Sequence, residues 1–215
     1  SNLGLAQSVD GKSATVQVGK ARPAAESKWA PLVLVGLIVL ATAVVYGQVH
    51  AHAFLNFDDQ LYLTDNPHVQ GGLTGEGVAW AFTARRASNW HPLTWLSHMA
   101  DCQLFGLNPA GHHLVNVGFH LVNSVLLFLV FFRLTGRLWP CGFVAAAFAL
   151  HPLHVESVAW AAERRDVLSG FFWMLTMLLY VRYVQRRGLV CYLAVAVILA
   201  LGLMAKPMLV TLPYV

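Results

Sequence analysis

The sequence is poor in charge. Asp, Glu, Lys and Arg make up 11% of its 215 residues, less than half of the roughly 25% found in soluble globular domains. Hydrophobic residues make up 57%, and the mean hydropathy is +0.58. This balance excludes a disordered chain and an ordinary cytosolic enzyme. The net charge of +4 indicates no nucleic-acid surface, because the basic residues separate apolar runs instead of forming one patch. The sequence therefore predicts a polytopic membrane protein.

Cysteine is also scarce, and known metal motifs are missing. Cys102, Cys141 and Cys191 are too few for a disulfide framework, and none lies at metal-binding spacing from another. The ten histidines include no pair at the i,i+4 spacing of a helical zinc site and no His-Glu-x-x-His motif. We therefore predict no metal site and no cofactor. A divalent-ion requirement is possible but not indicated.

Uncharged apolar runs define the predicted spans. Residues 1–28 are small, polar and basic, as expected of a flexible cytoplasmic tail. The run 30–49 has 20 uncharged residues, enough to cross a hydrocarbon core about 30 Å thick. Further spans are predicted near 113–133, 138–155, 167–185 and 188–205, with a sixth cut off within 207–215. The predicted fold class is all-α, with residues 29–215 forming the N-terminal part of a membrane helical bundle.

The segment 50–112 separates the first two spans and is expected to be an outer loop with short interfacial helices. Positive-inside counting supports this topology, because most of the 14 basic residues then fall on the N-terminal, cytoplasmic side. Five basic residues break the rule: Arg85, Arg86, Arg164, Arg165 and Lys206. Since the rule concerns insertion, basic residues that break it near a membrane boundary are candidates for a function on the outer side.

Two acidic residues, Asp58 and Asp59, follow the first predicted span. Adjacent carboxylates repel one another and are costly to bring near hydrocarbon. That environment suits a general base or a cation ligand. The alternative is a helix cap or a solvated turn.

Two similar helix starts carry candidate substrate ligands. His91-Pro92-Leu93 recurs sixty positions later as His151-Pro152-Leu153, and proline favours the first helical position. The candidate substrate-binding residues are Trp90, His91, His112, His113, His151 and Glu156. The alternative is interfacial anchoring through tryptophan, with the histidines merely hydrogen-bonded.

Three cations, Arg164, Arg165 and Lys206, are candidates for binding a lipid phosphate. Arginine binds phosphate in a bidentate manner, and all three residues belong to the predicted outer side. The alternative is an internally neutralised surface loop. Three outer cations together with a carboxylate pair suggest an anionic lipid substrate.

Six motifs in order resemble the transmembrane and TPR-repeat-containing glycosyltransferase family, whose animal members are O-mannosyltransferases and which has bacterial relatives. They are FLNFDD (54–59), NWHPLTWLSH (89–98), HHLVN (112–116), HPLHVESVAW (151–160), ERRDVLS (163–169) and AKPMLVTLP (205–213). The resemblance covers about residues 30–215. The family's later spans and TPR repeats are not among these motifs, so we expect the N-terminal part of a longer protein.

The resemblance implies a GT-C fold in a multi-pass protein of the bacterial inner membrane or the endoplasmic reticulum. A sugar, such as mannose, would pass from a polyprenyl- or dolichyl-phosphate carrier to a protein or glycan hydroxyl on the periplasmic or lumenal side. The family's presumed catalytic base falls on Asp58, with Asp59 beside it. Assigning the carrier phosphate to Arg164 and Arg165 extends the resemblance through their position.

Two other functions remain open. The chain could be a transporter or flippase of an anionic lipid, or a non-catalytic membrane scaffold. A transporter is expected to place charges or broken helices at mid-membrane. The predicted apolar runs carry no charge there, which favours the glycosyltransferase.

Overall fold

The computed structural model describes residues 27–85 and 90–214, and this part of the chain is helical. Three described segments are long and apolar enough to cross a membrane: Ala30–Ala51, Pro109–Thr135 and Ala161–Gln185. A fourth is present if the bent pair Leu138–Leu150 and Pro152–Ala159 forms one span. An all-α chain with several candidate spans is therefore confirmed. The predicted tail lies almost wholly outside the described residues, as does Arg86.

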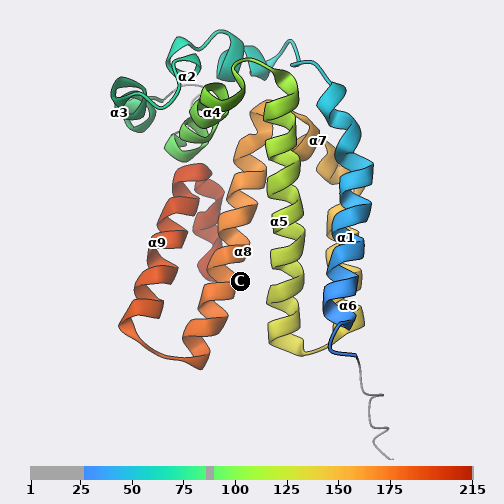
Figure 1. The fold of residues 1–215 in the computed structure, drawn as a ribbon. Coiled ribbons are helices and arrows are strands. Elements are labelled where there is room, and N and C mark those ends of the chain that lie inside the picture. Colours follow the sequence, from blue (N-terminus) through green and yellow to red (C-terminus); the bar gives the residue numbers. More distant parts are fainter. Residues whose placement is uncertain (1–26, 86–89, 215) are drawn as a thin grey trace, which may run out of the picture.

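Five long helices form the upright bundle in Figure 1. They are α1 (Ala30–Tyr46), α5 (Pro109–Thr135), α6 (Leu138–Leu150), α8 (Arg164–Gln185) and α9 (Leu189–Ala205). Helix α5 packs against α1, α6 and α8, while α9 packs against the face of α8 that points away from α5. A single turn of 3-10 helix, Gly47–Ala51, extends α1.

The segment between α1 and α5 folds across one end of the bundle (Figure 1), and we call residues 52–108 the head. It contains a π-helical turn (Gln60–Thr64), α2 (Pro67–Gln70), α3 (Gly75–Thr83) and α4 (Pro92–Phe105). Tyr62, Trp95 and Met99 form its core, which continues into Ala161 and Ala162 beside the start of α8. The head is therefore packed onto the bundle through a shared core.

Local sequence sets the ends of α5. Asn108 caps its first turn by accepting a hydrogen bond from the Ala110 amide at 3.1 Å, and Pro109 occupies the first position. Gly136 ends the helix with φ 67°, a left-handed conformation that glycine adopts without a Cβ clash. These local signals determine where α5 begins and ends.

The C-terminal half differs from the predicted straight spans. Helix α6 ends at Leu150, and a 48° bend precedes Pro152–Ala159, because proline disfavours helical conformation in the residue before it. Helix α9 has 17 residues, fewer than the roughly 20 that span a bilayer. The expected sixth span begins instead as a 3-10 segment, Pro207–Tyr214, packed on α9. It continues the chain beside the bundle without forming an α-helix within the described residues.

Candidate functional site

The two predicted catalytic carboxylates differ in burial. Asp59 is completely buried, and its two oxygens accept hydrogen bonds at 2.8 Å from the amides of Leu55 and Ala162. It thereby ties the head to the start of α8. Asp58 is half-buried, and its carboxylate accepts no hydrogen bond from the described residues. The catalytic role predicted for Asp58, with Asp59 beside it, stays a prediction; of the two, Asp58 has the carboxylate that is not already hydrogen-bonded within the described residues.

The two adjacent arginines also differ in burial. Arg164 is completely buried, and its guanidinium donates to Asp101 Oδ2 at 2.6 Å, Ser97 Oγ at 2.7 Å and the carbonyl of His112 at 2.9 Å. A further hydrogen bond runs to the side chain of Asn116. All three guanidinium nitrogens are therefore engaged. Its donors hold α4 and α5 together, and the predicted contact of Arg164 with a carrier phosphate stays a prediction.

Arg165 remains accessible beside Tyr62. Its guanidinium is half-buried, lies 2.5 Å from Glu163 Oε1 and donates to the Tyr62 hydroxyl at 3.1 Å. Burial raises the pKa of Tyr62, while the charge of Arg165 lowers it and that of Asp58 raises it. Both charges are thus close enough to act on one phenol. Tyr62, which the sequence did not single out, is the hydrogen-bond partner of Arg165.

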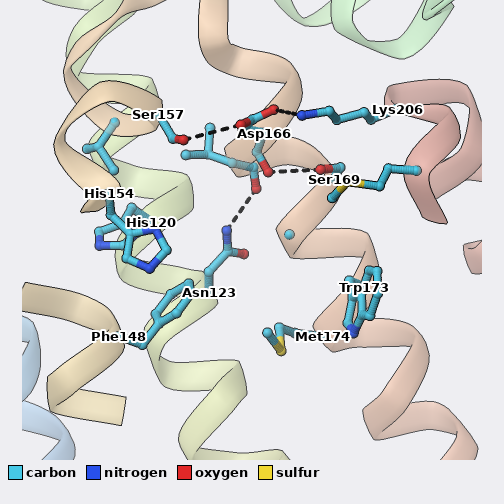
Figure 2. A pocket seen from close by; sticks show the side chains of 14 residues that line it. His120, Asn123, Phe148, His154, Ser157, Asp166, Ser169, Trp173, Met174 and Lys206 are labelled. Atoms are coloured by element: carbon cyan, nitrogen blue, oxygen red, sulfur yellow. Dashed lines mark hydrogen bonds and ion pairs between the residues drawn. The ribbon is translucent and has the colours of Figure 1, made fainter. Parts of the chain in front are cut away.

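Lys206 lines a cavity of about 210 Å³ between α5, α7 (Val155–Ala159), α8 and the C-terminal 3-10 segment. It pairs with Asp166, which also accepts a hydrogen bond from Ser157 at 3.2 Å. Figure 2 shows this charged group at one end of the cavity and Trp173 farther along α8. His120 and Asn123 also line it. The cavity combines a cation with hydroxyl, amide and apolar groups.

A second cavity, of about 500 Å³, lies between the first residues of the head and α7. Its lining is mostly apolar and includes the aromatic side chains of Phe54 and Trp160, together with the polar side chains of His52 and Glu156. Glu156 is exposed and is the predicted substrate ligand that lines this cavity. His151 instead caps the following turn, its Nδ1 accepting from the Leu153 amide at 3.2 Å.

His91 is buried inside the head, Trp90 lies at the surface of the head, and His113 is buried in the first turns of α5. His91 is 1% exposed and stacks on Tyr62 with ring centroids 5.6 Å apart. Burial, followed by the charge of Arg165, lowers the pKa of His91 to about 4. Trp90 is 41% exposed, with its indole donating to the Phe82 carbonyl. Both histidine rings are buried, and their predicted role in substrate binding stays a prediction.

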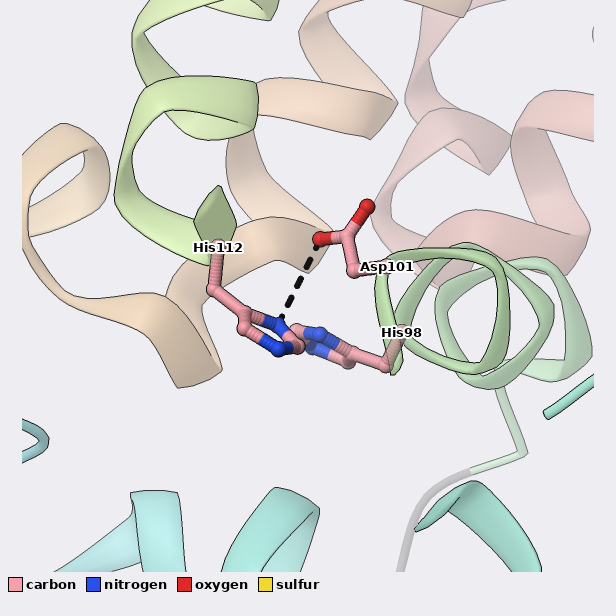
Figure 3. A group of neighbouring side chains, drawn as sticks. All are labelled: His98, Asp101 and His112. Carbon is pink, nitrogen blue, oxygen red and sulfur yellow. Dashed lines mark ion pairs between the residues drawn. The ribbon is translucent and has the colours of Figure 1, made fainter. Parts of the chain in front are cut away.

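His112 belongs to a buried cluster with His98 and Asp101 (Figure 3). One potential ligand atom from each residue lies within 4.8 Å of the other two. Burial and the charge of Arg164 hold the pKa of His98 well below its usual value, so the ring is neutral. The sequence predicts no metal site because its histidine pairs lack the spacing of a helical zinc site. The missed signal is the i,i+3 spacing of His98 and Asp101, which puts both side chains on one face of α4.

Comparison with curated proteins gives one group of relatives. The chain is 37% identical over 99 residues, 46% of its length, to protein O-mannosyl-transferase Tmtc1 of Drosophila melanogaster. It is 34% identical over 100 residues to TMTC2 of Mus musculus, and 30% identical over 158 residues, 68% of the chain, to TMTC1 of Mus musculus. The matched regions span 12% to 16% of these relatives' lengths. No protein-family model and no solved structure matches the chain.

Proposed function

We propose that this chain, a distant homologue of the N-terminal portion of the TMTC protein O-mannosyl-transferases, carries the catalytic end of a GT-C type glycosyltransferase. The reaction would transfer a sugar, mannose by analogy with the relatives' names, from a polyprenyl- or dolichyl-phosphate carrier to a hydroxyl acceptor. The homology and the candidate membrane helices support this proposal. The acceptor would be a protein or glycan on the lumenal or periplasmic side.

The observation that carries the proposal is the division of each charged pair into a buried and an accessible residue. Asp59 and Arg164 are fixed in the interior. Asp58 and Arg165 are half-buried, and Arg165 donates to the Tyr62 hydroxyl. Glycosyl transfer needs one group to accept a proton and another to stabilise the departing phosphate. The two accessible residues supply both.

In the proposed mechanism, Asp58 accepts the proton of the acceptor hydroxyl as its oxygen attacks the anomeric carbon. The bond between that carbon and the phosphate oxygen breaks, and its electron pair leaves with the phosphate. Arg165 stabilises this growing negative charge. Glu163, 2.5 Å from Arg165, orients the guanidinium.

The cavity beside α7 is the proposed location of the sugar or acceptor. Aromatic side chains such as Phe54 and Trp160 offer flat apolar faces, and Glu156 and His52 offer hydrogen-bonding groups at the rim. Phe54 and Leu55 lie three to four residues before Asp58 in the chain. A ligand in this cavity would therefore be next to the segment that carries the base.

The experiment compares Asp58→Asn with Asp59→Asn in the purified protein. Asp58→Asn removes the base and nearly preserves shape, so turnover should fall by about 10² to 10⁴ with unchanged thermal stability. Asp59→Asn sets an amide donor against two backbone N–H groups and should lower the thermal stability instead. The exposed Asp65 is the matched control, and Asp65→Asn should change neither quantity. A stable, inactive Asp59→Asn with an active Asp58→Asn would contradict the assignment.

A lipid flippase is the second candidate, and the Lys206–Asp166 pair inside a cavity favours it. Flipping would depend on Lys206 as the phosphate ligand and would not require Asp58. A vesicle assay with a fluorescent polyprenyl-phosphate analogue distinguishes the two. Translocation that is lost in Lys206→Met and kept in Asp58→Asn would support the flippase over the transferase.

A further inference from the structure

The cluster of His98, Asp101 and His112 lies where the head meets the bundle. Helix α4 supplies His98 and Asp101, and the first turn of α5 supplies His112. Figure 3 shows the Asp101 carboxylate directed toward the His112 ring, with the His98 ring beside it. The three side chains come from both sides of the Gly106 turn and are at most 4% exposed. Such a group is shielded from solvent and fixed by two helices.

The hydrogen bonding of His112 defines its tautomer. Its Nε2 lies 3.0 Å from the Gly106 carbonyl oxygen, which can only accept, so Nε2 carries the proton. In the neutral ring Nδ1 then presents a lone pair. That nitrogen is 3.5 Å from Asp101 Oδ2, and two electron-rich atoms repel one another unless a positive centre lies between them. Arg164 already pairs with the same Asp101 oxygen at 2.6 Å.

His98 adds a second, independent observation. It is completely buried, and neither ring nitrogen has a hydrogen-bond partner within the described residues. Buried imidazole nitrogens without partners are costly. The His112 Nδ1 is also without a partner there. A single cation among the three side chains would accept lone pairs from both rings.

From this geometry we propose that His98, Asp101 and His112 bind a divalent transition cation of the Zn²⁺ class. Two imidazoles and one carboxylate are a ligand set typical of such ions. Tetrahedral Zn²⁺ with bonds of about 2.0 to 2.1 Å places its ligand atoms about 3.4 Å apart, close to the separation of His112 and Asp101. His98 needs only a small rotation, since the ligand atoms already lie within 4.8 Å of one another.

In this site Arg164 would hydrogen-bond the Asp101 carboxylate without binding the ion itself. It donates to the same Asp101 oxygen at 2.6 Å, and a carboxylate oxygen has a second lone pair left for the ion. Hydrogen bonds of this kind orient metal-binding carboxylates. The positive charge of Arg164 opposes a second cation, so the affinity should be lower than that of a closed structural zinc site. The ion would join α4 to α5, and the proposal does not depend on glycosyl transfer.

The test uses Co²⁺ and Zn²⁺ as probes on the purified protein in lipid nanodiscs after treatment with a chelator. Co²⁺ should bind at one equivalent per chain and give visible d–d absorption, which Zn²⁺ should abolish. Zn²⁺ should raise the unfolding temperature, and the chelator should reverse the rise. His98→Asn and Asp101→Asn should each weaken Co²⁺ binding by tenfold or more. His50→Ala, at an exposed histidine outside the cluster, should bind Co²⁺ as the wild type does.

Two results would overturn the proposal. The first is a wild-type protein, tested without any substitution, that shows neither Co²⁺ absorption nor a change of unfolding temperature with Zn²⁺. Alternatively, folded His98→Asn and Asp101→Asn variants with undiminished Co²⁺ binding would place the ion elsewhere.

Discussion

Replacing Arg164 by methionine tests whether this residue stabilises the fold or binds the donor. Methionine has a similar length but no donors, so Asp101, which is 4% exposed, would keep a buried charge without its ion pair at 2.6 Å. Removing one partner of a buried pair costs about 3 to 5 kcal/mol. The free energies of the separate Arg164 hydrogen bonds do not add to this cost, because contacts that share one guanidinium are not additive. The loss is a large share of a typical stability of about 5 to 15 kcal/mol.

Arg165→Met is the matched control at the next position. The side chains of Arg165 and Glu163 are 23% and 11% exposed, so their ion pair is partly solvated and worth less than the enclosed one. Folding should be nearly unchanged. If Arg165 contacts the carrier phosphate, losing a charged hydrogen bond of about 1.5 to 3 kcal/mol should raise the apparent donor constant roughly ten- to a hundredfold.

The assay measures thermal unfolding of each solubilised variant together with the donor-concentration dependence of sugar transfer. Adding Asp101→Asn to Arg164→Met should recover part of the lost stability, because the uncompensated charge is removed. The reasoning fails if Arg164→Met unfolds at the wild-type temperature but needs more donor. It also fails if Arg165→Met destabilises the protein as strongly as Arg164→Met.

Three further predictions concern packing, pH and topology. An alanine Cβ at Gly111 would lie 2.4 Å from Phe105 Cγ, so Gly111→Ala should cost about 1 to 3 kcal/mol and lower the unfolding temperature. Burial lowers the pKa of His91 to about 4, so the unfolded state binds more protons below about pH 6.5. Stability should therefore fall by up to about 3 kcal/mol between pH 6.5 and pH 4, a loss that His91→Phe should reduce in pH-dependent unfolding. In intact cells an impermeant maleimide should label Leu153→Cys, at a residue 81% exposed, but not Gly188→Cys at the other end of the bundle. The reverse pattern would invert the predicted orientation.

The sequence by itself determined the helical class and several helix ends. The uncharged run beginning at Ala30 became a candidate span, because a long apolar stretch can satisfy its backbone in hydrocarbon only as a helix. Pro109 and Gly136 mark the ends of α5 for local steric reasons that are visible in the sequence. The bend after Leu150 is also local in origin, since Pro152 disfavours a helical conformation at the preceding residue.

Only the tertiary structure decided which member of each charged pair can reach a ligand. Asp59 is fixed by the amide of Ala162, 103 residues away, and Arg164 by Asp101, 63 residues away. Neighbours in sequence have nearly the same local environment, so residue type and spacing cannot show which side chain turns inward. The cluster of His98, Asp101 and His112 has the same origin, because the Gly106 turn brings α4 and α5 together. Burial and hydrogen bonding depend on contacts between distant segments, and these exist only once the head has packed on the bundle.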